Sequence, residues 1–335
     1  PVLNRVMPPT DPILIILFSF LTLLLAAAAV LRLLITRDVD GTITYAFPEE
    51  QFLLYRIVPL AAALIVGAGL GVSGMGLQVL LRNPLASPWI LGLSSGAGLG
   101  VMSVMYVEYA YPVSFEGSHM IGAIVGALFS LSCVYLLSRR RGGIDPISMV
   151  LVGVVVSVIC SAGIMVLQHA VPMGLRGAFT TWLMGRLPEV ESELRLTIFA
   201  GIVLTGIWLV AWWGPTLDAA CLSDDEAKSV GVDLAKVRRR LFLTSSVLAS
   251  VGVILAGPIA FVGLIAPHGA RLLFGGSHRQ LAVTTALVGA FLLVGADDIR
   301  QYIDLGTGRL PIGIVTSVFG GLVFLFLQLK GRGRI

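Results

Sequence analysis

Charged residues are scarce in this sequence. Only 13% of its 335 residues are Asp, Glu, Lys or Arg, whereas about a quarter of a typical soluble domain is charged. Hydrophobic residues make up 56%, and the mean hydropathy is +0.94. So little polar surface cannot cover a soluble globule, and the composition therefore favours a protein whose solvent is the lipid bilayer.

Motifs of catalysis and metal binding are also lacking. The three cysteines, Cys133, Cys160 and Cys221, show no CxxC or metal-ligand spacing, which favours small buried side chains. The four histidines form no cluster, and no GxxxxGKS/T phosphate loop occurs. We therefore expect no metal site, no catalytic residue and no cofactor in this chain, and a membrane-embedded enzyme is disfavoured.

Long apolar stretches indicate the membrane spans, because a crossing helix needs about 20 apolar residues. Stretches without Asp, Glu, Lys or Arg cover 12–31, 57–81, 83–107, 117–138, 146–175, 196–217, 241–270, 280–296 and 310–329. Two of these nine, 146–175 and 241–270, are longer than one span. The first ends in a loop near Pro172. The second is broken at Gly257-Pro258, since proline interrupts a helix, which raises the count to ten.

The loop charges agree with ten spans. With the N-terminus in the cytoplasm, 15 of the 23 Lys and Arg residues fall on the cytoplasmic side, as the positive-inside rule requires. Both termini are then cytoplasmic. We predict an all-α polytopic membrane protein with about ten transmembrane helices, in one domain, 1–335. The first apolar run is interpreted as a span, because it is longer than the core of a signal peptide and no A-x-A-like cleavage site ends it.

Two loops are long. The outer loop 171–195 could hold a short interfacial helix, with Trp182 at headgroup depth. In the cytoplasmic loop 218–240, Ser223 and Glu226 have the spacing of a capping box, and Gly231 would end the helix. A second helix would start within 233–240 and enter the next span. Two interpretations stay open for this loop, a solvated connector or a pair of short helices offered to a cytoplasmic partner.

No span centre carries an ionisable residue. Proton- or sodium-coupled carriers usually keep such groups at the midplane, so a carrier working alone is disfavoured. If this chain takes part in uphill transport, the energy must come from another subunit.

Four short motifs follow one another along the chain. The first runs from Gly74 and Gln78 through RNPLASP (82–88) to LGLSSGA (91–97). The others are GPIAFVGLIAPHGARLL (257–273), LPIGIVTSVFGG (310–321) and the turn from Ala227 to Gly231. In these motifs the sequence resembles, from about residue 50 to its end, the permease subunits of bacterial ABC importers for iron-siderophores, haem and vitamin B12, often called the FecCD permease family.

The resemblance implies a type II importer permease in the bacterial inner membrane. Such permeases form homodimers, with ten helices per subunit and a pore along the dimer axis. Two cytoplasmic ATPase subunits, which bind the ATP and Mg²⁺, dock on the loop between spans six and seven, and a periplasmic substrate-binding protein docks on the outer face. Nucleic acid is not among the expected partners.

The same resemblance implies roles for individual residues. The expected ATPase contacts are Ser223, Glu226, Ala227, Gly231 and Val232. Architectural roles, in turns and close helix contacts, are expected for Gln78, Arg82, Asn83, Pro84, Gly92, Pro267 and His268. In particular, Arg82-Asn83-Pro84 resembles a cytoplasmic turn, and His268 is placed at a Pro-His helix break.

Outer arginines of the family pair with acidic groups of the binding protein, and here the sequence departs from the family pattern. Arg56 matches the first of these arginines, but the second is absent from RIVP (56–59). Arg300 or Arg309 could restore the lost charge. The pore and its gate are expected along span five and span ten, with the span-five candidates being Ser148, Met149, Ser157, Ser161 and Met165.

The leading hypothesis is therefore the membrane half of an ATP-driven importer of an iron chelate, either a siderophore complex or haem. Cobalamin, or less often an oxyanion, is the alternative cargo within the same family. The chain itself does not identify the chelate.

Overall fold

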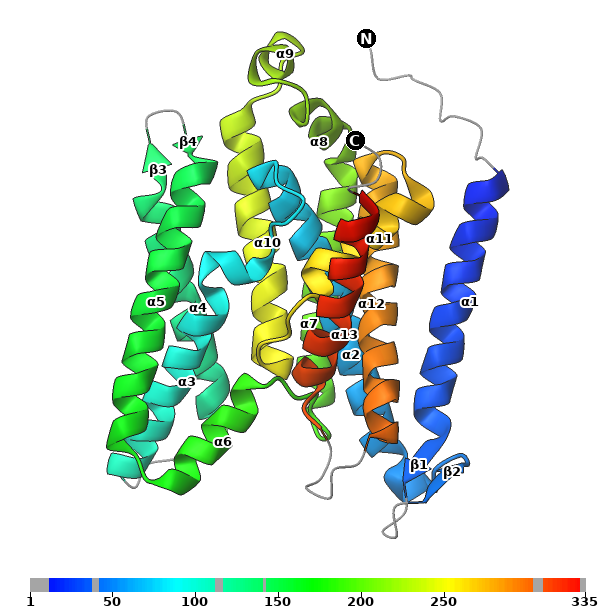
Figure 1. Ribbon diagram of the computed structural model, residues 1–335, viewed down its shortest axis with the longest axis vertical. Helices are drawn as coiled ribbons and strands as arrows, with labels where there is room; N and C mark the ends of the chain where they lie inside the picture. The colour runs from blue at the N-terminus through cyan, green and yellow to red at the C-terminus, as the bar shows by residue number, and fades with distance from the viewer. Residues whose placement is uncertain (1–11, 38–41, 112–116, 141–142, 304–309, 332–335) are drawn as a thin grey trace.

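The computed structural model describes residues 12–37, 42–111, 117–140, 143–303 and 310–331. Ten helices of at least 13 residues lie in these ranges and form a bundle (Figure 1). They are α1 (Pro12–Leu34), α2 (Glu50–Leu81), α3 (Leu93–Ala110), α4 (Ser118–Leu137), α5 (Pro146–Ala170), α7 (Glu193–Trp212), α10 (Leu234–Ala256), α11 (Val262–Phe274), α12 (His278–Tyr302) and α13 (Ile312–Gly331). Each of the ten predicted spans contains one of them, and the all-α prediction is confirmed.

Seven of the ten are long and apolar enough to cross a bilayer by length and composition, namely α1, α2, α4, α5, α7, α10 and α12. Helix α11, with 13 residues, measures only about 20 Å, so it reaches part of the way through a hydrocarbon layer of about 30 Å.

Short elements cap the two ends of the bundle. At one end lie α8 (Gly214–Ala220), α9 (Asp224–Ser229) and the pair β3 (Arg139–Arg140) and β4 (Gly143–Ile144), beside the start of α1 and the end of α13 (Figure 1). At the other end lie α6 (Met173–Leu183) and the hairpin of β1 (Ile35–Arg37) and β2 (Ile43–Tyr45). Helix α6 is the short helix expected in the loop 171–195, and Phe179 stacks on Trp182 within it.

The long apolar run 241–270 is broken where the sequence predicted. Helix α10 ends at Ala256, and Gly257 takes a positive φ of 68°. Phe261 also has a positive φ, 66°, just before α11 begins. The chain between the two helices is anchored from outside, because the indole of Trp89 donates a hydrogen bond to the Ile259 carbonyl (3.1 Å).

The predicted Pro-His break is wrong, because α11 runs without interruption through Pro267 and His268. Pro267 has no N–H to give to the carbonyl of Gly263, four residues earlier. Gly74 of α2 packs against that carbonyl so closely that a Cβ at Gly74 would lie 1.7 Å from its oxygen. The proline thus permits a close backbone approach between α2 and α11 instead of ending the helix.

The third predicted span, 83–107, is not one helix. Its first ten residues form a turn and the 3-10 helix η1 (Pro88–Leu91), and α3 starts only at Leu93. Gly92 makes the transition with φ 69°, and its carbonyl accepts a hydrogen bond from the hydroxyl of Ser130 (2.8 Å). A side chain at Gly92 would be strained and would meet the Gly153 carbonyl at 3.1 Å, which fits the architectural role predicted for this residue.

Helices α3 and α4 approach each other through glycines. A Cβ at Gly100 would lie 1.9 Å from the Gly122 oxygen, and a Cβ at Gly126 would lie 2.1 Å from the Gly96 oxygen. Small residues let helix backbones pack closely where lipid tails give no hydrophobic drive for association. The glycines at the end of the first motif and just after it thus bring α3 close to α4.

We expect Gly100→Leu to destabilise the protein by about 1–3 kcal/mol or more, because the new side chain must push α3 away from α4. Thermal unfolding of the detergent-purified protein would measure the loss. Gly177→Leu is the matched control, since nothing lies within 4 Å of a Cβ built there. Equal melting temperatures for the two variants would contradict the close contact.

Candidate functional site

Helix α9 projects from one end of the bundle (Figure 1) and starts at a complete capping box. The hydroxyl of Ser223 accepts a hydrogen bond from the backbone N–H of Glu226 (3.3 Å), and the Glu226 carboxylate accepts one from the backbone N–H of Ser223 (3.1 Å). The hydrogen bond that the Ser223 hydroxyl donates to the Glu226 carboxylate (2.7 Å), and after it the bond from the Ser223 backbone N–H, hold the pKa of Glu226 below its usual range. Their stabilising effect is present above the ordinary glutamate pKa and is lost as the pH falls through the lowered value.

The end of α9 is equally well defined. Gly231 has φ 85°, its N–H donates to the Lys228 carbonyl (2.9 Å), and the N–H of Val232 donates to the Ala227 carbonyl (2.9 Å). This is the Schellman arrangement, which favours glycine at this position. Asp233 then caps α10 by accepting from the N–H of Lys236 (3.0 Å). The predicted helix, its glycine end and the second helix are confirmed.

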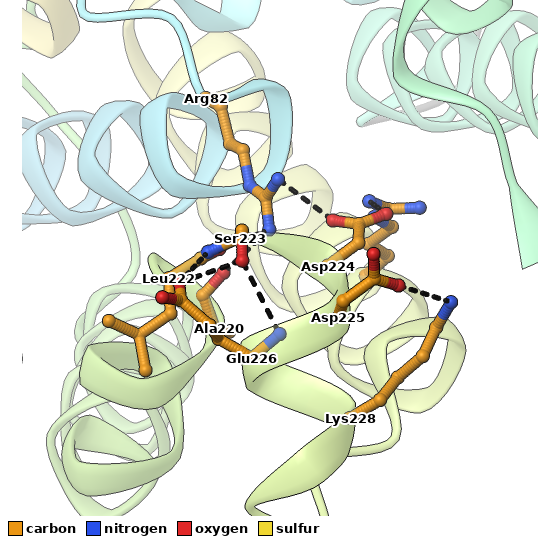
Figure 2. A network of polar contacts seen from close by, with 9 residues as sticks. Arg82, Ala220, Leu222, Ser223, Asp224, Asp225, Glu226 and Lys228 are labelled. Atoms are coloured by element: carbon orange, nitrogen blue, oxygen red, sulfur yellow. Dashed lines mark hydrogen bonds and ion pairs between the residues drawn. The ribbon is translucent and has the colours of Figure 1, made fainter.

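Arg82 fastens this projecting segment to the core helix α2 (Figure 2). Its guanidinium donates hydrogen bonds to the carbonyls of Ala220 (3.0 Å) and Leu222 (2.8 Å), on both sides of the α8–α9 junction. It also forms an ion pair of 2.8 Å with Asp224, the first residue of α9. We call residues 214–233, with α8 and α9, the α8–α9 segment. The Arg82 side chain therefore contacts both helices of the α8–α9 segment.

The backbone at Arg82 is unusual, since this residue ends α2 in the left-handed conformation with φ 46°. The N–H of Asn83 closes the helix end on the Gln78 carbonyl (3.1 Å), and the Asn83 side chain accepts from the N–H of Leu85 (2.9 Å). Pro84 follows where the helix has already ended. The RNP motif is thus a turn that ends α2, and it also aims Arg82 at the α8–α9 segment.

Gln78 extends the connection from α2 into α11. Its side-chain oxygen accepts a hydrogen bond from Arg271 (2.5 Å), and its side-chain nitrogen lies 3.5 Å from the Leu264 carbonyl. Gln78 and Arg82 lie four residues apart at the end of α2, so this end of the helix contacts both α11 and the α8–α9 segment. His268 is partly buried on the same helix.

The tip of the α8–α9 segment exposes apolar side chains among charged ones. Leu222 is 45% and Val230 61% exposed, and Asp225, Glu226 and Lys228 are exposed beside them. An apolar patch on a charged, projecting tip indicates a protein contact. Among the predicted ATPase contacts, Ser223, Glu226 and Gly231 are exposed and Val232 is partly exposed. Ala227 is fully buried in the hydrophobic core, so it supports the tip from beneath and does not offer a contact.

The span-five candidates fall on two different faces of α5. Met165 is 68% exposed and Ser161 is partly exposed. Met149 is fully buried, so the structure contradicts a pore-lining role for it in this conformation. Ser157 donates its hydroxyl to the Gly153 carbonyl (2.8 Å) and faces Gly92, while Ser148 bonds to Asp145 (2.5 Å), the cap of α5.

The outer face of α5 is instead a continuous apolar stripe. It consists of the exposed residues Ile147, Leu151, Val154, Val155, Val158, Ile159, Met165 and Val166. Their spacing of three and four residues places them along one side of the helix. Apart from Met165, the exposed wall therefore consists of apolar residues that were not singled out from the sequence.

The predicted docking arginines also differ in their surroundings. Arg56 is partly exposed and donates to the Thr36 hydroxyl (3.1 Å) near the β1–β2 hairpin. Arg309 lies outside the described residues. Arg300 is only 2% exposed, so it cannot present its charge to a docking protein, and that prediction is wrong.

With this geometry in place, comparison with known proteins decides the family. A model of the FecCD transport family matches residues 12–330. The chain belongs to that family. The hemin transport system permease protein HmuU of Yersinia pestis is 34% identical, over 83% of this chain and 82% of its own length. The vitamin B12 import system permease protein BtuC of Vibrio cholerae is 36% identical, over 84% of both chains.

Two further matches cover nearly the whole chain. The iron(3+)-hydroxamate import system permease protein FhuG of Bacillus subtilis is 32% identical, over 96% of this chain and 95% of its own. A solved structure, described as an inward-facing conformation of a metal-chelate type ABC transporter, covers 95% of this chain and 99% of its own with a TM-score of 0.82 at 29% identity. The FecCD-family chain is thus a multi-pass membrane permease, and the resemblance drawn from its motifs is confirmed.

Sequence reasoning missed a group of buried charged side chains in this permease. Arg32 of α1 and Arg300 of α12 both pair with the carboxylate of Asp297, and all three are at most 2% exposed. Asp298 is buried beside them. The sequence placed these residues in outer loops because the charge-free stretches end at 31 and 296. The remaining signal was the i, i+3 spacing of Asp297 and Arg300, which brings the two onto one helix face.

Proposed function

We propose that this chain is the membrane subunit of an ATP-driven importer whose cargo is an iron chelate, either a siderophore complex or haem. The observation that carries the proposal is the α8–α9 segment, a rigidly capped projection with an apolar tip that Arg82 fastens to the core. The relatives named for hemin and for iron(3+)-hydroxamate support the choice of cargo.

The partners follow from the same proposal. Two separate ATPase subunits bind the α8–α9 segments of two copies of this chain and supply the ATP and Mg²⁺, so no cofactor is assigned to the permease itself. A periplasmic binding protein delivers the chelate to the opposite end, where Arg56 is the remaining docking candidate among the described residues. Arg309 stays a candidate from the sequence. Exposed charges of this kind accelerate docking more than they add affinity.

The proposed site of action is the bacterial inner membrane, with both termini in the cytoplasm. Support comes from the loop charges, since the end that holds the α8–α9 segment also carries the basic run Arg238, Arg239 and Arg240. Pro12 of α1 begins and Gly331 of α13 ends at this same end of the bundle (Figure 1).

In the proposed mechanism the ATPase moves the α8–α9 segment, and Arg82 transmits the movement to α2. Gln78 passes it on to Arg271 of α11, and the glycine contact between Gly74 and Gly263 makes the two helices move as one body. The apolar wall of α5, with Ser161 and Met165 on its accessible side, gives a bulky chelate few groups to bind tightly. No ionisable group of the chain is needed to energise the transport.

Vitamin B12 is the second candidate cargo, because the Vibrio cholerae BtuC relative is as similar in sequence as the hemin permease. Purified permease, its ATPase and its binding protein in proteoliposomes would distinguish the two. We expect ATP-dependent accumulation of a ferric siderophore or of haem, unaffected by a protonophore. Uptake of cobalamin alone would show that cobalamin, and not an iron chelate, is the cargo. Uptake that follows a proton gradient without ATP would refute the proposal of an ATP-driven importer.

A further inference from the structure

A cysteine, a histidine and an aspartate meet at the base of the α8–α9 segment. The sulfur of Cys221, the residue that ends α8, lies 3.7 Å from Nε2 of His278 at the start of α12. Nδ1 of His278 lies 2.5 Å from the carboxylate of Asp218, which also accepts a hydrogen bond from the His278 backbone N–H (3.0 Å). None of the three was singled out for function from the sequence, and the proposed transport does not use them.

The order of these contacts is that of an activated nucleophile. The Asp218 carboxylate accepts a hydrogen bond from the protonated Nδ1, which leaves Nε2 free to accept the thiol proton of Cys221. Asp218 thereby positions the ring, and the ring acts on the thiol. A histidine that only packed in the core would not need an acceptor on one nitrogen and a thiol at the other.

Two arginines belong to the wider surroundings of Cys221. Arg271 of α11 interacts electrostatically with it, and the guanidinium of Arg82 binds the carbonyls of both adjacent residues, Ala220 and Leu222. Two acidic groups of the segment stand three residues on either side of Cys221, and both are engaged: Asp218 with His278, and Asp224 with Arg82 and Arg238. Thiolates become reactive in such electropositive and accessible places. Cys221 is exposed, whereas Cys133 is partly buried and Cys160 is buried.

We propose that Cys221 is a reversibly oxidised thiol, activated by His278 and Asp218, that responds to hydroperoxides at the base of the α8–α9 segment. His278 takes the thiol proton, and the sulfur attacks the O–O bond of the hydroperoxide. An S–O bond forms as the O–O bond breaks, and the leaving oxygen takes the proton from the imidazolium. The cysteine becomes a sulfenic acid, and the peroxide is reduced to water or an alcohol.

A low-molecular-weight thiol restores the cysteine in two steps. The first thiol condenses with the sulfenic acid to a mixed disulfide and releases water, and a second thiol displaces Cys221 from it. Both the sulfenic acid and the mixed disulfide break the contact between Cys221, which joins α8 to α9, and His278. The effect on transport rests on the proposed function, whereas the reactivity of the thiol does not.

The decisive measurement is the pH profile of alkylation of Cys221 by iodoacetamide, read by mass spectrometry on the intact permease in detergent. We expect Cys221 to react roughly tenfold faster at pH 7 than it does in His278→Gln, and the two rates to converge near pH 9.5, where an ordinary thiol ionises by itself. Asp218→Asn should fall between them. His119→Gln, which removes a histidine paired with Glu108 elsewhere, is the matched control and should leave the profile unchanged.

A merely structural role for His278 would change the access to Cys221 by the same factor at every pH. Parallel profiles would therefore overturn the proposal, and so would equal rates in all variants. In a second measurement, dilute hydrogen peroxide followed by a dimedone trap should label Cys221 in the unmodified protein and at least several-fold less in His278→Gln. Labelling that prefers Cys133 or Cys160 would also refute it.

Reconstituted transport separates this inference from the proposed function. Peroxide should slow ATP-driven uptake in the unmodified permease and leave Cys221→Ser unaffected. If uptake is not driven by ATP but the alkylation profiles differ as expected, the importer assignment fails and the reactive thiol stands. If uptake is driven by ATP and the profiles are parallel, only the thiol proposal fails.

Discussion

Replacing Arg82 by Glu should reduce ATP-driven uptake at least about tenfold while leaving the permease folded. The substitution removes two hydrogen bonds from the guanidinium to the carbonyls of Ala220 and Leu222, and it places a carboxylate beside Asp224. Charge-assisted hydrogen bonds contribute about 1.5–3 kcal/mol each when they are shielded, and less here because Arg82 is 40% exposed. The segment would lose its attachment to α2, so ATP hydrolysis would continue without moving the core.

Two substitutions at the same position separate the side chain from the backbone. Arg82→Gly removes the guanidinium but suits the left-handed φ of 46°, so it should keep the helix end and still lose uptake. Arg82→Lys should retain part of the activity, because an ammonium cannot reach a carboxylate and two carbonyls with a planar fork. The matched control is Arg186→Glu, an exposed arginine paired with Glu189 on another loop.

Uptake and ATP hydrolysis measured together give the answer. A drop in uptake with hydrolysis retained is the expected result. If Arg82→Glu transports at the rate of the unmodified protein, the proposed path from the α8–α9 segment to α2 is wrong.

The sequence was sufficient for those parts of the fold that local chemistry determines. The capping box at Ser223, the glycine end at Gly231 and the break at Gly257 each depend on a few neighbouring residues, and the structure has all three. The number of helices followed from apolar length and loop charge, which report on the solvent of the chain and not on contacts between distant residues.

Local patterns failed where a distant contact decides. Pro267 was expected to end a helix, but Gly74 on another helix supplies the packing that lets α11 continue. Arg300 was expected at the surface because it stands just past an apolar run, yet Asp297 and the arginine of α1 surround it. Arg82 was expected only to end a turn, because its partners on the α8–α9 segment lie about 140 positions further along the chain.

Separation along the chain also explains why the sequence did not reveal the ion-pair group of Arg32, Asp297 and Arg300, which holds α1. Helix α1 stands at the edge of the bundle and packs mainly on α12 (Figure 1). Its lipid-facing side chains gain little from association, because lipid tails are as apolar as they are. Arg32, which is fully buried against Asp297, is the polar contact that fixes its position.

Replacing Asp297 by Asn should therefore destabilise the permease by about 3–5 kcal/mol. The change is nearly isosteric, but it removes the charge of the carboxylate that Arg32 and Arg300 share and leaves only the Asp298 carboxylate beside the two buried guanidinium groups. Removing one partner of a buried ion pair costs about that much. Glu191→Gln is the matched control. It removes the carboxylate that pairs with Arg195 (3.1 Å) in a more exposed place, where such a pair contributes at most about 1 kcal/mol.

Replacing the whole group distinguishes charge from packing. A triple variant with Arg32→Met, Asp297→Leu and Arg300→Met removes the two arginines together with the carboxylate that they share and keeps similar volumes, so it should recover most of the lost stability. Thermal unfolding in a single detergent measures all three proteins. Shape and not charge holds α1 to α12 if Asp297→Asn has the same melting temperature as the unmodified permease. The same conclusion follows if the triple variant has a lower melting temperature than Asp297→Asn.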